Sequence, residues 1–138
     1  MHAIEIKVRG YHVDIYGHVN NARYLEFLEE ARWAFVEKYE DFMNIMQNGY
    51  NFNAVNININ YRKPAVTDDV IVVETELAKI KNRSAVIRQT IRLKDTDTII
   101  ADADITFILL DIKQNKAAVL EGEILSALEK LVNGADSL

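Results

Sequence analysis

The stretch Asp14-Ile-Tyr-Gly-His-Val-Asn-Asn-Ala-Arg-Tyr-Leu-Glu-Phe-Leu-Glu-Glu-Ala-Arg32 joins a polar turn to a long amphipathic segment. From Ala22 to about Tyr39, apolar residues recur at helical spacing, which predicts one helix of about five turns. Asn20 and Asn21 precede it, and asparagine is among the residues that best satisfy the free N–H groups of a first helical turn. The stretch therefore places an acid, an imidazole and two amides at a helix start, where an enzyme could hold its chemical groups.

Segments with the alternating pattern of strands lie on both sides of this helix. Ile4, Ile6 and Val8 alternate with charged residues and predict a half-buried strand that ends at Gly10. The other expected elements are an irregular segment around 44–53, strands at 55–61, 70–80, 85–93, 99–110 and 117–120, and a short helix over 124–132. Short connections make the long strands between 70 and 110 antiparallel neighbours.

The order of a strand, a long helix and a run of long strands indicates an α+β fold. A single sheet needs one apolar element to cover its inner face, and we expect the sheet to wrap around the helix. Asn56, Asn58 and Asn60 alternate with apolar residues, so the outer face is expected to be polar. We expect residues 1–138 to form one domain, and unpaired sheet edges favour a dimer.

Composition excludes several classes of function. The sequence contains no cysteine, which removes disulfides, thiolate zinc sites and a cysteine nucleophile. The formal net charge of -5 argues against a nucleic-acid surface, because nucleic-acid binders usually carry a basic excess. No apolar run approaches the roughly 18 residues that span a bilayer, so we expect a cytoplasmic protein without membrane insertion.

Asp14 lies just before the helix start, where unpaired N–H groups and the positive end of the helix dipole gather. One interpretation makes it a general base or nucleophile, with backbone N–H groups between Gly17 and Asn20 polarising a bound carbonyl. The other makes it an ordinary turn aspartate. His18 is also open to two interpretations, because a loop histidine can orient a substrate or serve only as a structural hydrogen-bonding residue.

Two charged residues of the helix have a structural and a functional interpretation. Helical spacing puts Arg32 inside the apolar arc and Glu29 at its margin, so the sequence favours an ion pair between them. Glu29 could instead face the acid and histidine of the turn, as an orienting or second acid–base group. His2 and His12 do not complete a set of metal ligands, so we expect no metal site.

Basic residues concentrate in two turns of an otherwise acidic chain. They are Lys79, Lys81 and Arg83, with Ser84, in one hairpin turn, and Arg62 and Lys63 before Pro64. Such runs are commonly solvated surface. They also suit the phosphates of a nucleotide handle, which basic side chains bind through charge-assisted hydrogen bonds.

The pattern Asp-x-x-Gly-His-Val-Asn-Asn-x-x-Tyr from Asp14, followed by Leu-Glu-Glu-Ala-Arg, resembles the hotdog-fold acyl-thioester hydrolases of the 4-hydroxybenzoyl-CoA thioesterase superfamily. Further segments are similar to bacterial long-chain acyl-CoA thioesterases of the FadM type. They are Gly-Tyr-His-x-Asp-x-Tyr from Gly10, Asn-Ile-Asn-Ile-Asn-Tyr-Arg from Asn56, Pro64-Ala65-Val66, Ala101-Asp102-Ala103, Ile105-Thr106-Phe107 and Leu120-Glu121-Gly122-Glu123. The similarity runs nearly from end to end.

The resemblance implies an antiparallel sheet wrapped around one long helix, in homodimers or homotetramers with active sites at the subunit boundary. It implies hydrolysis of a long-chain fatty acyl-CoA without a cofactor. The family's catalytic carboxylate falls on Asp14. Plant acyl-carrier-protein thioesterases are also similar at His18 and Glu29, which implies that these two residues assist. Tyr16 stands where the plant enzymes have asparagine, and Gly17 where the FadM-type pattern has glutamine.

On this resemblance Asp14 acts as general base or nucleophile, and the helix N-terminus stabilises the thioester oxygen. The expected oxyanion positions are the backbones of Gly17, Val19, Asn20 and Asn21. The expected substrate-binding residues are Tyr24 and Phe27 along the acyl chain, and Arg62, Lys63, Lys81, Arg83 and Ser84 at the CoA phosphates, from basic turns of a neighbouring subunit. The alternatives are an acyl-CoA-binding protein without turnover and a thioesterase for aromatic or short-chain acyl-CoA.

Overall fold

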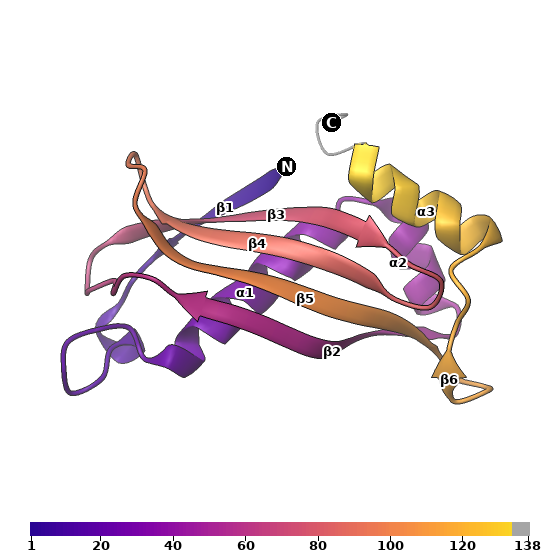
Figure 1. Cartoon of the computed structure of the whole chain (residues 1–138), viewed down its shortest axis with the longest axis horizontal. Coiled ribbons are helices and arrows are strands. Elements are labelled where there is room, and N and C mark those ends of the chain that lie inside the picture. The colour runs from indigo at the N-terminus through magenta and orange to yellow at the C-terminus, as the bar shows by residue number, and fades with distance from the viewer. Residues whose placement is uncertain (134–138) are drawn as a thin grey trace.

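The structure is a computed structural model that describes residues 1–133. Within them, one antiparallel sheet has the strand order β1-β3-β4-β5-β2, with β6 beside β5 (Figure 1). The strands are β1 (His2–Lys7), β2 (Tyr50–Tyr61), β3 (Val70–Ile80), β4 (Ala85–Leu93), β5 (Ile99–Asp111) and β6 (Lys116–Ala117). The helices are α1 (Asn21–Val36), α2 (Glu40–Gln47) and α3 (Gly122–Asn133), and a 3-10 turn spans Gly10–His12. This arrangement confirms the predicted α+β class.

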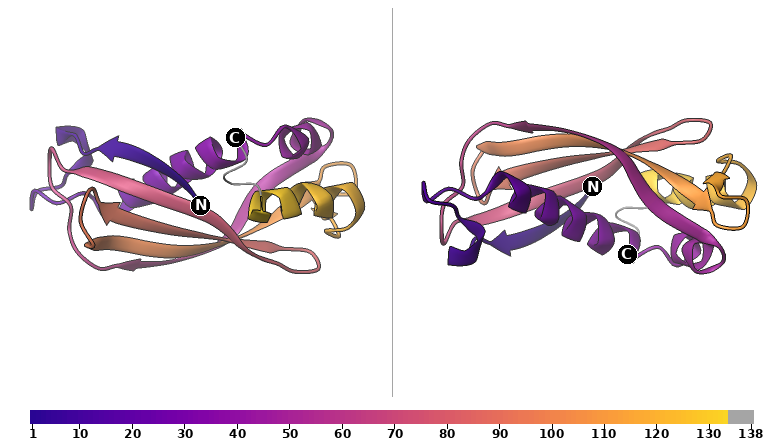
Figure 2. Two further views of the ribbon diagram at one scale, coloured as in Figure 1. Left: turned by 90° about the horizontal axis from the view of Figure 1, so that it is seen from above. Right: turned by 90° about the horizontal axis from the view of Figure 1, so that it is seen from below.

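The long helix α1 lies along the concave face of the sheet (Figure 2). Its side chains Tyr24, Leu28 and Ala31 are buried with inward-facing strand residues such as Ile71 and Ile105. Alternate residues of β3, β4 and β5 are buried, as expected for strands that turn one face to a core. The prediction of a sheet wrapped around one helix is therefore confirmed.

The prediction of an irregular segment around 44–53 is wrong. The helix α2 occupies most of its first half, and β2 already begins at Tyr50. Phe42 is fully buried, and its ring meets the Phe52 ring edge-on at 5.9 Å. A helix of about two turns is marginal by itself, so these contacts with distant parts of the chain stabilise it.

Two element limits also differ from the prediction. The helix α1 ends at Val36 rather than near Tyr39, and Tyr39 precedes α2 as its N-cap. Of the strand predicted at 117–120, only Ala117 lies in a strand, the two-residue β6 that pairs with β5. The chain then leaves β5, because the Leu120 N–H donates to the Asn82 oxygen in the β3–β4 turn at 2.8 Å. Within residues 1–133, no helix has the length and apolar character needed to cross a membrane.

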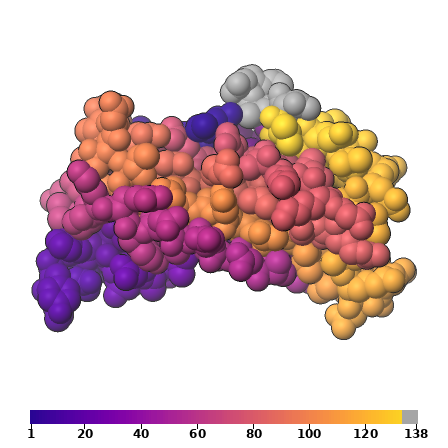
Figure 3. Space-filling model, in the orientation of Figure 1, coloured from indigo at the N-terminus to yellow at the C-terminus, as the bar shows by residue number. Residues whose placement is uncertain are grey.

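The strand β2 forms an open edge of the sheet and is visible along one long border of the molecule (Figure 3). Val55 and Ile57 on this strand are 56% and 39% exposed. On the outer face, the Asn60 amide donates to Asp102 Oδ1 at 3.2 Å. The outer face is therefore polar along β2, as predicted, while apolar side chains of the same strand remain uncovered.

Candidate functional site

The loop that carries Asp14 closes on itself before α1 begins. The Asp14 N–H donates to the His18 backbone oxygen at 2.9 Å, and the Gly17 N–H donates to the Asp14 backbone oxygen at 3.0 Å. Gly17 has a φ of 77°, which glycine adopts without strain. Asp14 Oδ1 accepts the Tyr16 N–H at 2.8 Å. The exposed carboxylate is thus held in one direction, and its Oδ2 has no partner within residues 1–133.

The backbone N–H groups near the helix start differ in their availability. Those of Gly17, Val19 and Asn20 each donate to a backbone oxygen. Asn20 Oδ1 accepts the Ala22 N–H at 2.9 Å and so caps α1. The Asn21 N–H opens the first turn and has no acceptor in the part of the chain that the structure describes. Of the four predicted oxyanion positions, Asn21 therefore keeps a free donor at the positive end of the helix dipole.

Asp14 and Asn21 line the same cavity, which has a volume of about 240 Å³. The other lining residues are His18, Val19, Tyr24, Tyr61, Arg62, Lys63 and Pro64. The Tyr24 oxygen accepts the Ala65 N–H at 3.1 Å, and burial raises the pKa of this phenol, which keeps its proton at neutral pH. The Tyr61 hydroxyl donates to the Asn21 backbone oxygen at 3.2 Å. A carboxylate, a free amide donor and a phenol therefore border one space.

Of two further predicted site residues, His18 lies at the Asp14 cavity and Phe27 does not. His18 lines the Asp14 cavity, and its exposed ring has no hydrogen-bond partner within residues 1–133. Phe27 lies in the core instead, where its ring meets the His12 ring edge-on at 4.9 Å and the Tyr24 ring at 6.2 Å. Phe27 therefore supports the helix start from behind and does not line the cavity.

Two basic residues, Arg62 and Lys63, follow β2, and only Lys63 is free to bind a ligand. Arg62 donates from Nε and Nη2 to the two carboxylate oxygens of Asp102, at 2.7 and 3.3 Å. This bond raises the pKa of Arg62 and lowers that of Asp102. Lys63 lines the same cavity and has no ion-pair partner within residues 1–133. Lys63 is therefore the residue of this pair that remains available to a phosphate.

The predicted ion pair between Arg32 and Glu29 is wrong. Arg32 points inward and donates from Nη1 to Gln89 Oε1 at 3.1 Å. Glu29 stays exposed and accepts the indole N–H of Trp33 at 3.4 Å. Both residues line a smaller cavity farther along α1 than the one that contains Asp14. Within one subunit, Glu29 therefore does not border the same cavity as the acid and histidine of the turn.

A comparison with family models decides which family this is. The model described as the thioesterase-like superfamily matches residues 8–128. The chain belongs to this superfamily. It is 48% identical over 128 residues to the long-chain acyl-CoA thioesterase FadM of Escherichia coli (strain K12), and the match covers 93% of this chain and 97% of FadM.

Solved structures agree with membership of the thioesterase-like superfamily. YbaW, a probable thioesterase from Escherichia coli, matches with a TM-score of 0.90 and 47% identity, over 95% of this chain and 98% of that chain. Slr0204, a 1,4-dihydroxy-2-naphthoyl-CoA thioesterase from Synechocystis, matches with a TM-score of 0.79 and 19% identity, over 94% of this chain and 96% of that chain. The second likeness shows the fold alone. Together they confirm the predicted hotdog fold.

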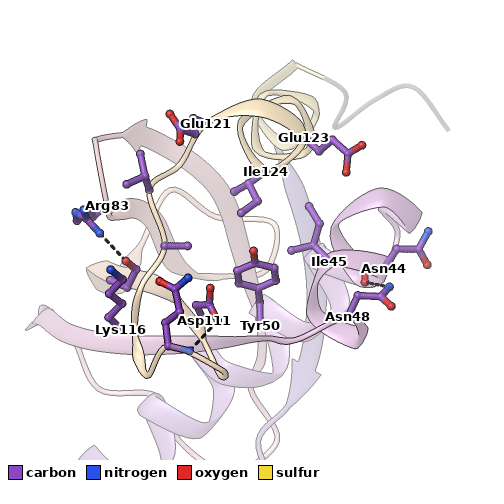
Figure 4. A pocket seen from close by; sticks show the side chains of 14 residues that line it. Asn44, Ile45, Asn48, Tyr50, Arg83, Asp111, Lys116, Glu121, Glu123 and Ile124 are labelled. Atoms are coloured by element: carbon purple, nitrogen blue, oxygen red, sulfur yellow. Dashed lines mark hydrogen bonds between the residues drawn. The ribbon is translucent and has the colours of Figure 1, made fainter.

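A larger cavity of this thioesterase-superfamily chain, of about 730 Å³, lies between α2, β6 and α3 (Figure 4). The elements that line it, α2, β6 and the start of α3, lie at the opposite end of the sheet from the loop before α1 (Figure 1). Arg83 lines it and donates from Nη1 to the Ala117 oxygen at 2.8 Å, next to Lys116. Lys81 and Ser84 close the β3–β4 turn, with the Lys81 N–H donating to the Ser84 oxygen at 2.7 Å. Acidic residues also line the cavity: Asp111, Glu121 and Glu123.

Sequence reasoning missed two residues at these sites. Tyr61 was expected only as the last apolar residue of a strand, but its hydroxyl reaches the backbone at the helix start. Its position beside Arg62 was a usable signal. Lys116 shares the large cavity with Arg83, and no sequence pattern connects the two because they meet only when β6 pairs with β5.

Proposed function

We propose that this protein hydrolyses long-chain fatty acyl-CoA to free fatty acid and CoA in the cytoplasm, with residues 1–138 acting as one thioesterase domain. The family match and the 48% identity to FadM support hydrolysis of an acyl-CoA thioester. The name of that relative supports the long acyl chain. The observation that carries the assignment to a site is the shared cavity of the Asp14 carboxylate and the free Asn21 N–H.

The proposed reaction uses the Asp14 carboxylate and the Asn21 N–H of this cavity for different tasks. The thioester carbonyl oxygen lies at the Asn21 N–H, where the helix dipole and the donor stabilise the charge that develops on attack. Asp14 either removes a proton from the attacking water or attacks the carbonyl carbon itself. In the general-base route, collapse of the tetrahedral intermediate breaks the carbon–sulfur bond, and the proton that Asp14 has taken from water passes to the sulfur, so that CoA leaves as a thiol. Attack by Asp14 itself would give an acyl anhydride and a CoA thiolate that takes a proton from solvent, and water would then hydrolyse the anhydride.

Other residues of the cavity support this chemistry. The exposed ring of His18 is assigned an orienting role beside Asp14, because it borders the cavity without a hydrogen bond of its own in residues 1–133. Tyr24 lines the floor near the helix start. A role for Glu29 at the same site requires a neighbouring copy of the chain, since Glu29 lines a different cavity in its own subunit.

The proposed assembly is a homodimer or homotetramer built on the open edge of β2. An unpaired edge with exposed Val55 and Ile57 is a template for another strand. Pairing of two copies of β2 about a two-fold axis would be antiparallel, and would bring the Asp14 end of one copy toward the β3–β4 turn of the other. Lys63 from one copy and Arg83 from the other are then the leading side chains for the CoA phosphates. Arg62, Lys81 and Ser84 lie beside them.

A panel of acyl-CoA substrates tests the function. Purified protein is incubated with butanoyl-, octanoyl-, dodecanoyl-, palmitoyl- and benzoyl-CoA, and released thiol is measured with a thiol-reactive dye. We expect thiol release, with the highest kcat/KM for the substrates that have the longest acyl chains. Tight binding of palmitoyl-CoA without thiol release would support a binding protein and contradict the proposal. The highest kcat/KM for benzoyl- or butanoyl-CoA would contradict the long-chain assignment.

A further inference from the structure

The cavity that Glu29 and Arg32 line has a volume of about 180 Å³ and lies between α1 and the start of β2. Its lining residues are Glu29, Arg32, Trp33 and Val36 from α1, and Phe52 and Ala54 from β2. The helix packs mainly against β1 and β3, at the far side of the sheet from β2, which leaves space along the β2 side. A cavity of roughly 150 Å³ with apolar walls is enough to bind a benzene ring. Part of an acyl chain therefore fits this space.

Arg32 lines this largely apolar cavity, and the polar side chain of Gln89 holds its guanidinium in place. The residue is only 8% exposed, and its Nη1 donates to Gln89 Oε1 at 3.1 Å. The Gln89 amide nitrogen donates in turn to the Leu28 backbone oxygen and to Thr75 Oγ1, each at 3.0 Å. Because both amide protons are engaged, the amide oxygen is held toward the guanidinium. The position of the guanidinium is therefore fixed before any ligand binds.

Most of the hydrogen-bonding capacity of Arg32 is unused. A guanidinium carries five N–H donors, and within residues 1–133 Arg32 donates one hydrogen bond, to Gln89, while Glu29 acts on it only through its charge. Burial lowers the pKa of Arg32, and the nearby charge of Glu29 raises it by less. Within residues 1–133, no Arg32 nitrogen is both shielded from solvent and unpaired, so the free donors open into the cavity and become unpaired only when a hydrocarbon ligand fills it. A leucine would suit such a ligand better. The free donors point to an oxygen acceptor that arrives with the ligand.

We propose that Arg32 binds an oxygen atom of the acyl chain, so that the preferred substrates are acyl-CoAs whose chain carries a hydroxyl or oxo group. This proposal rests on the proposed acyl-CoA hydrolysis and narrows its substrate class. Arg32 is a specificity-determining residue in this account, and Asp14 remains the chemical group. The unfilled donors of a preorganised guanidinium discriminate against a chain that lacks the oxygen, because they then stay unpaired.

The place of the oxygen along the chain depends on the direction from which the substrate enters. By helical spacing, Asn21, Leu25 and Arg32 lie on one side of α1, and the eleven residue-to-residue steps from Asn21 to Arg32 span about 16 Å. If the acyl chain of the substrate runs along α1 of the subunit that holds its thioester, the distal part of the acyl chain reaches Arg32. If the substrate enters from an antiparallel second copy of the protein, a part of the acyl chain nearer the thioester reaches Arg32. The chemistry recognised is the same in both cases, and substrates with oxygen at either place distinguish them.

Three matched substrates test the proposal: palmitoyl-CoA, β-hydroxypalmitoyl-CoA and ω-hydroxypalmitoyl-CoA. They have the same chain length and differ in one hydroxyl. For one of the two hydroxylated substrates, we expect the wild-type kcat/KM to exceed that for palmitoyl-CoA by about tenfold or more, the effect of a hydrogen bond to a charged group. Arg32→Met removes all donors at similar length and is expected to abolish the preference. Arg32→Lys keeps one cationic group and is expected to retain part of it.

Several outcomes would overturn the proposal. One is a wild-type enzyme that hydrolyses all three substrates with equal kcat/KM. Another is a preference that persists in Arg32→Met. A third is a loss of kcat/KM by the same factor on all three substrates in Arg32→Met, because this is the result expected if Arg32 only supports folding or subunit contact. Arg88→Met, at an exposed outer-face arginine paired with Asp104, is the matched control and is expected to leave the three values unchanged.

Binding of the free fatty acids separates this proposal from the proposed function. If the wild-type protein hydrolyses none of the substrates, binding of a hydroxylated palmitic acid about tenfold more tightly than palmitic acid, lost in Arg32→Met, supports Arg32 and contradicts hydrolysis. Equal binding of the acids overturns the role of Arg32 as well. If Arg32→Met does not fold, Arg32→Lys takes its place, and an undiminished preference in that variant also overturns the proposal.

Discussion

Replacing Tyr24 by phenylalanine removes one oxygen from a buried hydrogen bond at the edge of the proposed site. The Tyr24 oxygen accepts the Ala65 N–H at 3.1 Å, and both residues are buried. Without it the amide loses its acceptor in the core, which costs about 1–3 kcal/mol. With about 2.1 cal/mol/K of unfolding entropy per residue, this corresponds to a fall of about 3–10 °C in the melting temperature of the 138-residue chain.

Tyr61→Phe is the matched control, since it removes the same atom nearby. The Tyr61 hydroxyl donates to the Asn21 backbone oxygen at 3.2 Å, but at an exposed position where water can replace it. We expect a loss below about 0.5 kcal/mol, which is less than about 2 °C. Thermal unfolding of both variants at one protein concentration provides the comparison. Equal falls in melting temperature would refute the reasoning that burial decides the cost of losing these bonds.

Three further substitutions test the cap of α1 and two titrating groups. Asn20→Ala removes the side chain that caps α1 and is expected to lower the free energy of unfolding in urea by about 1 kcal/mol; a larger loss for Asn21→Ala would contradict this assignment. His12 accepts a backbone N–H through Nδ1, and burial lowers its pKa below 6.5. The unfolded state therefore binds protons first, and stability should fall as the pH drops through 6.5 and below; an equally steep fall in His12→Gln would count against this cause. The bond from Arg62 lowers the pKa of Asp102 below 3.8, so its stabilisation is present above that value and is lost as the pH falls through the folded-state pKa. Asp102→Asn should remove this part of the acid dependence, which is small because the pair is largely exposed, and an unchanged acid limb of the stability curve would show that the pair contributes nothing.

Local sequence patterns predicted the elements whose stability depends on their own residues. The strands at 70–80 and 85–93 match the predicted limits because alternating β-branched residues identify a half-buried strand directly. The start of α1 was predicted because the Asn20 cap and the helical periodicity agree. The helix α2 was missed because it is short, and its burial against β2 and α3 comes from residues distant in the sequence.

The sequence predicted which chemical groups form the site, but not which of them remain free to bind a substrate. The motif identified Asp14 and the backbone positions that follow it. Which N–H remains free depends on how the loop closes, and three of the four predicted donors are engaged by backbone oxygens. Helical spacing could offer Arg32 only the nearby Glu29 as a partner. Its actual partner, Gln89, is 57 residues away on β4, where only the packed fold brings it close.

The most direct test of the central claim is the kcat/KM of Asp14→Asn for palmitoyl-CoA. The asparagine oxygen can still accept the Tyr16 N–H that Asp14 Oδ1 accepts, so the loop keeps its conformation while the negative charge is lost. We expect kcat/KM to fall by about a hundredfold or more, the contribution of a positioned general base. Asp97→Asn, at an exposed turn, should retain the wild-type value. Wild-type kcat/KM in folded Asp14→Asn would contradict the account.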